Sequence, residues 1–388
     1  MTDSDRLKAI KGRSEQDDGV VDEESDVPGF SKPWDPKQIR ITTKTFSVRE
    51  VYSQIVEGET DLAPDFQRDF VWNIKKQVLL IESVLLGIPL PAFYFNQDAT
   101  GAFQVIDGVQ RLTTIKRFMS NELTLEETHL AYLKGLTGQR YDTLEPAVRR
   151  RFGLTQLVAH VIEPQTPEDV KFDIFSRVNT GGEPLHAQEI RHCMSKAKSR
   201  ELLKKLAESQ SFDEATNWQF WTYAPDNSEV RTSRRMVNRE LALRFCAFRS
   251  TSIEDYRKAT SLDGFLLEFT RRIDKEFSNQ QLDELVRVFD QAMKNSAAIL
   301  DIGAFRRWPP EADRRGPINR AVFESQALAL ADHPLKSLLP HKDKISKAFR
   351  KLFTEADYDN SIRSGTGDPN KVEKRLTATR DVVAKILS

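Results

Sequence analysis

The stretch FQVIDGVQRLTTIKRF, residues 103–118, changes its pattern near its centre. Its first part alternates apolar and polar residues, as β-strands do, whereas Leu112, Ile115 and Phe118 follow the spacing of one helical face. A helix that starts directly after a strand has backbone amides without partners at the positive end of its dipole. Phosphate groups bind at such helix ends. The stretch therefore predicts a strand–helix junction that suits an anion.

The side chains at this junction fit two different roles. In the first, Arg111 makes a bidentate contact to phosphate oxygens, Gln110 orients a water or a phosphate oxygen, and Asp107 helps to hold a divalent cation. In the second, Asp107 caps the helix, Gly108 makes the turn, and Arg111 is a solvated charge. Capping motifs of this kind are common, so the spacing alone leaves both open.

The composition excludes some classes of protein. Lys plus Arg and Asp plus Glu both number 58 among 388 residues, so no global field attracts nucleic acid or membrane, and an anion site must be local. No apolar run approaches the ~18 residues that span a bilayer. The N-terminal residues are charged where a signal peptide is apolar. Cys193 and Cys246 are too few for a disulfide framework and are expected to be buried thiols. We expect a cytoplasmic protein without a membrane partner.

The order of patterns predicts an α+β core followed by a mostly helical domain. Residues 1–36 are polar and acidic and are expected to be a disordered tail. Residues 37–195 contain strand-like segments, a predicted hairpin formed by AFYFN and AFQVID, and a helix between Asn73 and Gly87. Residues 196–388 are helical in pattern almost throughout.

Two further polar features stand close to apolar residues. Gln67 and Arg68 lie in PDFQRDFVW, where an arginine among aromatic residues suits stacking or phosphate contact as well as plain snorkelling. Glu82 lies in LLIESVLLG and, if buried there, requires a partner, for which a nearby arginine is the expected residue. The other interpretation of Glu82 is a residue at the edge of the apolar stripe.

These segments resemble a known family. The run from PDFQRDFVW through GIPLP to IDGVQRLTT is similar, in order and spacing, to the N-terminal domain family of the GmrSD modification-dependent restriction endonucleases. That family is related to the ParB/sulfiredoxin superfamily. The later block IFSRVNTGGEPLHAQEIR resembles a second segment typical of the family. The resemblance covers mainly residues 45–120 and weakens through the helical C-terminal half.

The resemblance implies a ParB/sulfiredoxin-like nucleotide-binding core in residues 37–195, with a nucleoside triphosphate and Mg²⁺ as cofactors. By matched position, the implied catalytic residues are Asp107, Gln110 and Arg111, with Asp107 also the implied Mg²⁺ ligand. The implied nucleotide-binding residues are Gln67, Arg68, Asp107, Gly108, Gln110, Arg111, Thr113 and Thr114. Residues with a supporting role around them are Glu82, Arg177, Asn179, Gly181, Gly182 and Glu189.

Two departures from the family pattern affect the expected activity. Residues 107–111 (DGVQR) form the motif here called the box. In most relatives the box has glutamine where this chain has Val109, so hydrolysis is expected to be weakened if that glutamine contacts nucleotide or water. Many relatives carry a C-terminal HNH nuclease domain, but the six histidines of this chain show no such arrangement. His186 and His192 are too far apart for one helical face and are more typical of surface or capping histidines than of a metal site. We expect a stand-alone member that requires a separate nuclease or defence-system partner.

Three functions are compatible with these sequence features. The first is a nucleotide-binding, NTP-hydrolysing component of a bacterial restriction or anti-phage system that acts on DNA or is regulated by it. The second is a DNA-binding or DNA-nicking module, in which basic segments contact phosphates and Trp308 stacks on a base. The third is a non-enzymatic adaptor with a degenerate nucleotide site. DNA is the expected partner in the first two, and a homo-oligomer is compatible with each.

Overall fold

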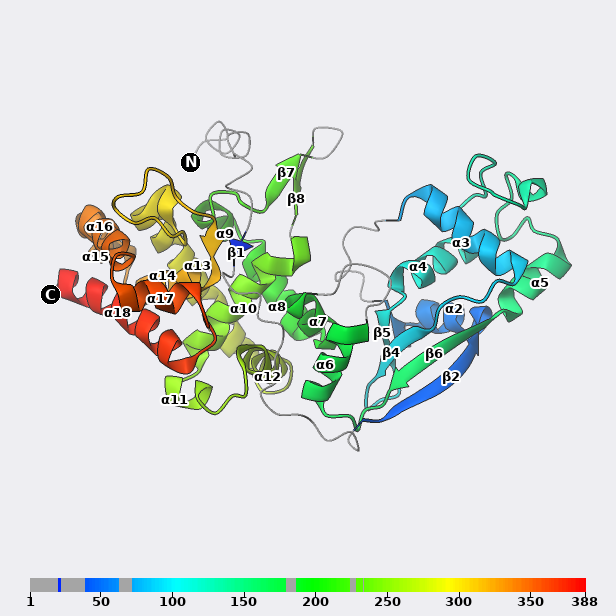
Figure 1. Ribbon diagram of the computed structural model, residues 1–388, viewed down its shortest axis with the longest axis horizontal. Coiled ribbons are helices and arrows are strands. Elements are labelled where there is room, and N and C mark those ends of the chain that lie inside the picture. The colour runs from blue at the N-terminus through cyan, green and yellow to red at the C-terminus, as the bar shows by residue number, and fades with distance from the viewer. Residues whose placement is uncertain (1–19, 22–38, 63–71, 179–185, 224–227, 233) are drawn as a thin grey trace. The chain divides into compact units, whose positions relative to one another are not determined.

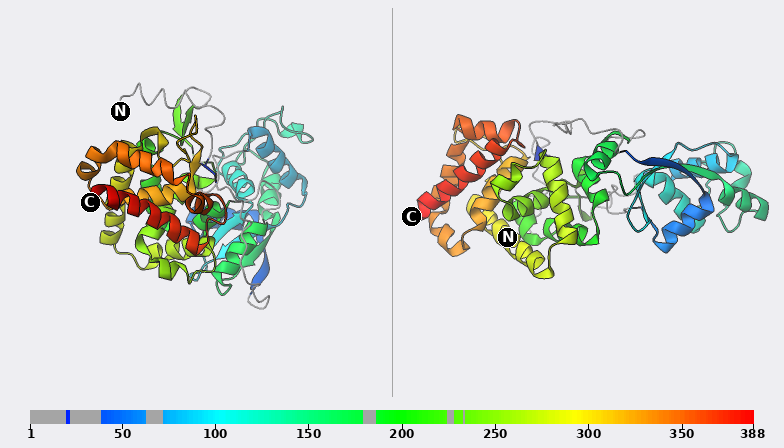
Figure 2. Two further views of the ribbon diagram at one scale, coloured as in Figure 1. Left: turned by 60° about the vertical axis from the view of Figure 1, so that its left-hand side comes forward. Right: turned by 90° about the horizontal axis from the view of Figure 1, so that it is seen from below.

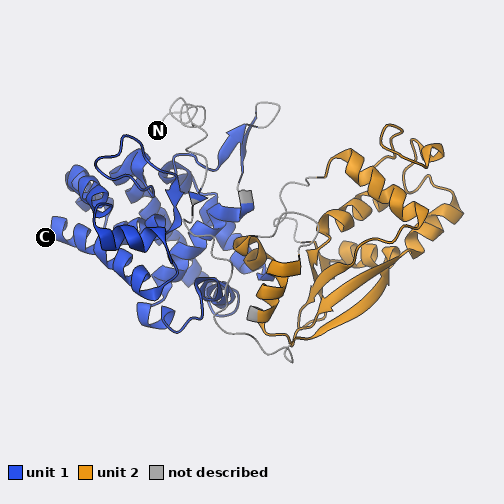
Figure 3. Cartoon of the chain, viewed as in Figure 1, with its two compact units in different colours: residues 1–31, 194–388 blue, residues 32–193 orange. Residues whose placement is uncertain are grey.

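The computed structural model describes residues 20–21, 39–62, 72–178, 186–223, 228–232 and 234–388. The chain divides into two compact units (Figure 3). Residues 32–193 form the first, here called the sheet unit, and residues 1–31 and 194–388 form the second, here called the helical unit. The predicted α+β class, with a sheet in the N-terminal part and a helical C-terminal part, is confirmed.

Five strands make up the sheet of the sheet unit, in the order β2-β6-β4-β5-β3 (Figure 1). They are β2 (Ile41–Ser47), β3 (Thr60–Asp61), β4 (Phe93–Gln97), β5 (Phe103–Asp107) and β6 (Gln156–Ile162). Strands β4 and β5 form the predicted antiparallel hairpin, with Phe95 opposite Val105. Strand β6 runs parallel to β4 and antiparallel to β2, so the sheet is mixed.

Six helices belong to the described residues of this unit, and α3 begins and ends at the capping residues predicted for it. They are α2 (Val48–Glu57), α3 (Ile74–Leu86), α4 (Val109–Met119), α5 (Pro146–Leu154), α6 (Glu168–Val178) and α7 (Ala187–Met194), with a 3₁₀ turn η2 (Lys134–Leu136). The side chain of Asn73 accepts a hydrogen bond from the backbone amide of Lys76 and starts α3. Gly87 ends the same helix in the left-handed conformation, as helix C-caps often do.

Strand alternation supplies one apolar face of the sheet for these helices to cover. Phe93, Phe95 and Val105 are buried in a single hydrophobic cluster that also contains Leu112 and Phe118 of α4. Helices α2, α3, α4 and α5 contact one another and contribute to this cluster. The helical face predicted from the 112–118 spacing is therefore the face that α4 buries.

The helical unit contains eleven helices in its described residues. They are α8 (Ala197–Ala207), α9 (Gln210–Ala215), α10 (Val237–Ser250), α11 (Ile253–Tyr256), α12 (Leu262–Lys275), α13 (Asn279–Leu300), α14 (Arg320–Ala331), α15 (Leu335–Leu338), α16 (Lys342–Leu352), α17 (Ala356–Arg363) and α18 (Pro369–Leu387), joined in places by 3₁₀ turns η3 (Arg234–Met236), η4 (Asp301–Gly303) and η5 (Leu339–His341). Helix α14 packs against α13 and α18 (Figure 2). Within the described ranges, no helix is both long enough and apolar enough to cross a membrane.

Short strands are the part of this unit that the sequence did not predict. Strands β7 (Trp221–Tyr223) and β8 (Glu229–Arg231) form an antiparallel pair within the segment expected to be helical. Strand β1 (Val20–Val21) lies in the segment 1–36 predicted to be a disordered tail, and pairs in parallel with β9 (Ile318–Asn319). The other residues of that segment lie outside the described ranges. Strands of two or three residues are too short to show a period in the sequence.

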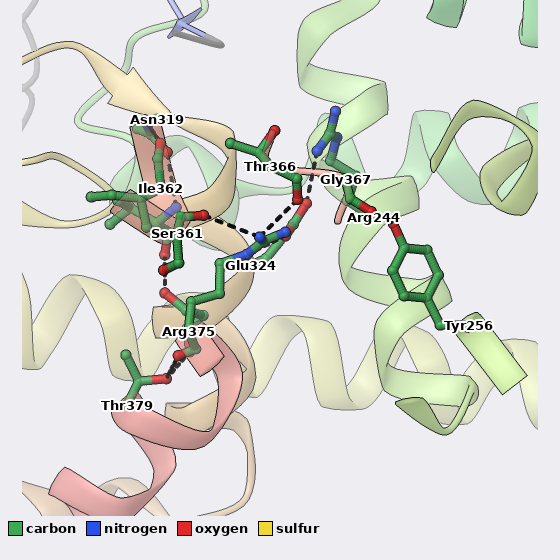
Figure 4. A network of polar contacts seen from close by, with 12 residues as sticks. Arg244, Tyr256, Asn319, Glu324, Ser361, Ile362, Thr366, Gly367, Arg375 and Thr379 are labelled. Atoms are coloured by element: carbon green, nitrogen blue, oxygen red, sulfur yellow. Dashed lines mark hydrogen bonds and ion pairs between the residues drawn. The ribbon is translucent and has the colours of Figure 1, made fainter. Parts of the chain in front are cut away.

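A buried ionic network joins three helices of the helical unit (Figure 4). Glu324 of α14 is fully buried and accepts hydrogen bonds from Arg244 of α10 at 2.8 Å and from the Nε of Arg375 of α18 at 3.1 Å. Arg375 also donates to the carbonyl oxygen of Thr366 at 2.8 Å. Because these charges are buried and hydrogen-bonded together, removal of Glu324 would leave Arg375 buried without its ion-pair partner, whereas Arg244 would keep its contact with Glu240.

Candidate functional site

The predicted strand–helix junction is present, and Gly108 forms its turn. Strand β5 ends at Asp107, and Gly108 caps α4 with φ +99°. A Cβ atom at position 108 would lie 2.3 Å from Cδ1 of Phe93, so both the backbone conformation and the available space require glycine. The N-cap residue of α4 is Gly108 itself, which has no side chain to cap the first turn. The alternative in which Asp107 caps this helix is therefore wrong.

Arg111 is held by the protein on several sides. Its Nη2 lies 3.1 Å from Oδ2 of Asp107 and 3.3 Å from the carbonyl oxygen of Ala92, and its Nη1 donates to the carbonyl oxygen of Pro91. Its guanidinium carbon lies 4.3 Å from the centre of the Phe93 ring. Only 12% of the Arg111 side chain is exposed, so the alternative of a solvated helix charge is also wrong. Arg111 ties the first turn of α4 to the segment that enters β4.

Burial shifts the pKa values of Asp107 and Arg111 in opposite directions. Desolvation raises the pKa of Asp107 above its usual value, although the charge of Arg111 and a hydrogen bond from the Gly108 amide act against the shift. Desolvation lowers the pKa of Arg111, with Asp107 opposing. Both shifts mean that the charged forms are less favoured here than in water. Ion pairs of this kind, in which each charge is partly desolvated, occur frequently at functional sites.

The other residues of the box fall into an outer and an inner set. Gln110 and Thr113 are half-buried on α4. Thr114 is fully buried, and its hydroxyl donates to the carbonyl oxygen of Gln110 at 2.8 Å, so this hydroxyl is used within the helix. Val109 is 3% exposed and belongs to the hydrophobic cluster of the sheet unit. The residue that departs from the commonest box thus points into the core.

Gln67 and Arg68 lie outside the described residues, but the chain just after them is anchored by a pair that the sequence did not predict. The side-chain amide of Gln77 donates to the carbonyl oxygen of Trp72 at 2.7 Å and accepts from Nη1 of Arg117 at 2.7 Å. This contact links the start of α3 to α4. The signal in the sequence is a glutamine that interrupts the apolar stripe of α3.

Glu82 is buried, which decides between its two interpretations, but its partners are not the expected arginine. The side chain of this residue is 2% exposed in the core, and its carboxylate accepts three backbone hydrogen bonds, from the amides of Ala131 at 2.9 Å and of Tyr132 and Leu133 at 2.7 Å. Burial acts to raise the pKa of Glu82, but these hydrogen bonds and the charge of Lys134 lower it overall. The expected arginine partner is therefore wrong, and Glu82 holds a loop rather than a ligand.

The later block is described only in part, because Asn179, Gly181 and Gly182 lie outside the described residues. Arg177 is largely exposed, and its Nε lies 3.1 Å from a carboxylate oxygen of the buried Asp173. The carboxylate of Glu189 accepts a hydrogen bond from the backbone amide of His186 at 2.7 Å, which stabilises the start of α7.

Two other predicted features can be placed. Cys193 and Cys246 are buried free thiols, as predicted. In the described part of the chain, no three His, Cys, Asp or Glu side chains gather in a way that would hold a metal ion. Asp107 is the single carboxylate of the box, and one carboxylate suits Mg²⁺ when the phosphate oxygens of a ligand and water supply the remaining positions. The donor set thus fits a phosphate-bound Mg²⁺ rather than a metal held by protein alone.

Comparison with known proteins identifies the sheet unit. Residues 48–195 match the family model of the GmrSD restriction endonuclease, N-terminal domain. These residues form a domain of that family. The match confirms the resemblance inferred from the two boxes, and it contains the Asp107–Arg111 junction. No curated protein and no solved structure matches the chain.

The match to the GmrSD N-terminal domain ends where the helical unit begins, and Trp308 lies beyond it. Stacking of Trp308 on a base belongs to the second of the three functions compatible with the sequence. Its Nε1 donates to the carbonyl oxygen of Ala312 at 3.1 Å, the guanidinium carbon of Arg350 lies 4.3 Å from the centre of its ring, and Gly303 packs closely against it. Trp308 is therefore committed to contacts within the chain.

Proposed function

We propose that the chain is a nucleotide-binding, NTP-hydrolysing component of a bacterial restriction or anti-phage system that acts on DNA or is regulated by it. The observation that carries this proposal is the Asp107–Arg111 ion pair, partly desolvated at a helix start without a side-chain cap and located inside a GmrSD N-terminal domain. Uncapped helix starts favour phosphate, and partly desolvated charged pairs are typical of functional sites.

Each residue of the junction has a definite role in this proposal. Asp107 would hold Mg²⁺ beside the phosphates. Arg111 positions Asp107 through their ion pair and adds positive charge near the phosphates. Gln110, half-buried in the first turn of α4, orients the attacking water. A bound Mg²⁺ supplies neutralisation of phosphate charge. Gly108 lets the backbone pass close to Phe93, which brings Arg111 and Asp107 together.

The position of Val109 argues against the adaptor with a degenerate site. That alternative depended on the loss of a glutamine that contacts nucleotide or water. Val109 is buried in the core, so in this chain position 109 contributes packing, whereas the polar residues at 107, 110 and 111 are half-buried. We therefore favour a site that retains its polar groups.

Calorimetry and phosphate release test the proposal directly. A panel of nucleoside triphosphates with Mg²⁺, with and without DNA, would be compared for the wild type, Asp107→Asn and Gln110→Ala. We expect Asp107→Asn to bind nucleotide at least 10-fold more weakly, and Gln110→Ala to bind normally with slower turnover. Asp290→Asn is the control, because Asp290 forms an exposed ion pair at the same spacing with Lys294. Normal turnover by folded Asp107→Asn protein, or no nucleotide binding by the wild type, would contradict the proposal.

A restriction function also requires a nuclease, and we propose that it is a separate partner protein. The proposal is supported by the sequence, whose six histidines show no HNH arrangement. Co-purification of the chain with the protein encoded beside it, followed by DNA cleavage by the pair and not by either alone, would support this partner. Cleavage by the purified chain alone would show that it is itself a nickase or nuclease.

A further inference from the structure

Strand β2 forms one edge of the five-stranded sheet, so only one of its two sides is paired with a neighbouring strand (Figure 1). That neighbour is β6, and the two strands run antiparallel. At one end of the pair, the backbone amide of Glu163 donates to the carbonyl oxygen of Arg40 at 2.9 Å. At the other end, the amide of Val48 donates to the carbonyl oxygen of Thr155 at 2.9 Å. Because hydrogen-bonded pairs alternate along an antiparallel ladder, the even-numbered residues of β2 are the ones bonded to β6.

The backbone groups of Ile41, Thr43 and Thr45 therefore point away from the sheet. Among the described residues, the amides and carbonyls of these three residues have no hydrogen-bond partner. A row of unpaired backbone groups is a template on which another strand can pair. The edge at β2 thus offers three consecutive outward positions for such a strand.

The usual protection of an edge strand is missing from β2. Proteins keep edge strands from pairing with proline, with a β-bulge or with charged side chains at the edge. Strand β2 contains no proline, and its register with β6 is unbroken. Its one charged residue, Lys44, extends across the sheet, with its ammonium group 5.4 Å from the centre of the Phe103 ring. Neither the backbone nor the charge of β2 therefore prevents pairing.

Exposed apolar side chains lie beside this edge. Ile41 is 41% exposed, and Val158 of β6, which lies opposite Thr45, is 40% exposed. Both are on the face of the sheet opposite to the buried Phe46, because side chains alternate along a strand. Single exposed apolar residues are common. These two share one face next to one unpaired edge, which a further strand would extend.

A second copy of β2 fits this edge in one register. In an antiparallel pair with two-fold symmetry, each contact occurs twice, once in each direction. If the axis passes through Thr43, this residue faces its own copy and Ile41 faces Thr45 of the second copy, so the outward backbone groups are paired. β-Branched residues then lie opposite one another, which favours strand pairing. Lys44 faces Thr42 of the second copy and meets no charge.

The neighbouring registers are less favourable. With the axis one residue earlier, Lys44 faces Arg40 of the second copy, and with the axis one residue later, the two Lys44 residues face each other. Like charges directly opposite destabilise a strand pair. With the axis two residues later, pairing would need the amide of Ser47, which donates to the carboxylate of Glu50 at 3.3 Å. Charge and backbone bonding therefore select the register centred on Thr43.

We propose that two copies of this chain associate through β2, antiparallel about a two-fold axis at Thr43, and join their sheets into one. Ile41 of one copy then lies in the same row as Thr45 and Val158 of the other, on the outer face of the joined sheet. The surface does not involve the junction at Asp107, because β6 and β4 lie between β2 and β5. The proposal is therefore independent of the proposed nucleotide site.

Sedimentation equilibrium of the full chain over a range of protein concentrations tests this association. The test variant is Thr43→Lys, which places two like charges opposite each other at the axis. The matched control is Thr128→Lys. Both threonines are exposed residues of the sheet unit with the hydroxyl near the Nδ1 of a histidine, at 3.0 Å for Thr43 and His160 and 3.4 Å for Thr128 and His129.

We expect the wild type and Thr128→Lys to form the same dimer, and the dimer dissociation constant of Thr43→Lys to be at least about 10-fold higher. Circular dichroism checks that both variants are folded. A wild type that stays monomeric at every concentration would overturn the proposal. Dimerisation of folded Thr43→Lys with the affinity of the wild type would overturn it as well.

Disulfide cross-linking tests the register without a disruptive substitution. The Cα atoms of a hydrogen-bonded antiparallel pair are about 5.5 Å apart, which a disulfide can span. Thr43→Cys should therefore give a cross-linked dimer on mild oxidation, whereas Thr42→Cys, which faces Lys44 of the second copy, should give little. The native Cys193 and Cys246 are buried and should not contribute. No cross-linking of Thr43→Cys, or equal cross-linking of both variants, would contradict the register.

Discussion

The guanidinium of Arg111 stacks on the ring of Phe93, with 4.3 Å between its central carbon and the ring centre. Phe93 is the first residue of β4, and Arg111 lies in the first turn of α4. The contact therefore ties the start of one strand to the helix that follows the next strand. It places the charge of Arg111 beside Asp107 and fixes its direction.

Replacement of Arg111 by lysine should remove the stacking contact with Phe93. Lysine keeps the charge but cannot make the several simultaneous hydrogen bonds or the flat stacking of a guanidinium. We expect Arg111→Lys to lose about 1–3 kcal/mol of unfolding free energy, together with most nucleotide affinity. Urea unfolding and calorimetry measure the two effects. Arg287→Lys, at an exposed i,i+3 pair with Glu284, should change stability by less than about 1 kcal/mol; an equal loss would show that the Arg111 contacts are not special.

Gly108→Ala should be more costly than the same change at another left-handed glycine. Alanine in this backbone conformation costs about 1–2 kcal/mol, and the contact with Phe93 adds about 1–3 kcal/mol of overpacking. Gly58 has φ +79° and no atom within 4 Å of a Cβ built on it, so Gly58→Ala isolates the backbone part. Thermal unfolding of both variants gives the difference, and equal shifts in Tm would contradict the close approach at Phe93.

Glu82 should contribute stability that depends on pH. Its folded-state pKa is lower than the usual value of 4.5, so ionised Glu82 stabilises the fold above about pH 4.5. That stabilisation is lost as the pH falls through the lower folded-state pKa. Glu82→Gln should cost about 1.5–3 kcal/mol at pH 7 and flatten the acid limb of the stability curve. Exposed Glu57 provides the control, and an unchanged acid limb in Glu82→Gln would count against this role.

Glu324→Gln should destabilise the helical unit far more than loss of a surface pair. The change leaves Arg244 and Arg375 buried without the charge that both contact, at an expected cost of about 3–5 kcal/mol. Glu373→Gln breaks an exposed pair with Arg257 and should cost less than about 1 kcal/mol. Denaturant unfolding followed by circular dichroism compares the two. A small loss in Glu324→Gln would mean that the network is replaceable.

Local pattern was enough to predict the elements around the junction. The change from alternating to helical spacing gave β5 and α4, and Asn73 and Gly87 gave the ends of α3. These features depend on residues within a few positions of one another. Two neighbouring boxes, with their order and spacing, were also enough for the family.

Contacts between segments far apart in the chain could not be predicted from the sequence. Arg111 bonds to carbonyl groups about 20 positions earlier, and Glu82 to amides about 50 positions later, and backbone partners leave no mark on residue type. An arginine was expected for Glu82 because charge complementarity is the only partner signal that a sequence displays. The inward direction of Val109 depends on how α4 is rotated against the sheet, which one box of five residues does not define.

The inward direction of Val109 also separates two kinds of variation within the box. Substitutions at 109 act through the fit of α4 to its neighbours, so their effects should be offset by compensating changes among the surrounding core residues. Substitutions at 107, 110 and 111 change polar groups instead, so repacking of the core would not offset their effects. A library that varies these four positions together with the surrounding core residues would test this difference. The stability effect of a change at 109 should depend on the core residues, and the effects of changes at 107, 110 and 111 should depend on one another.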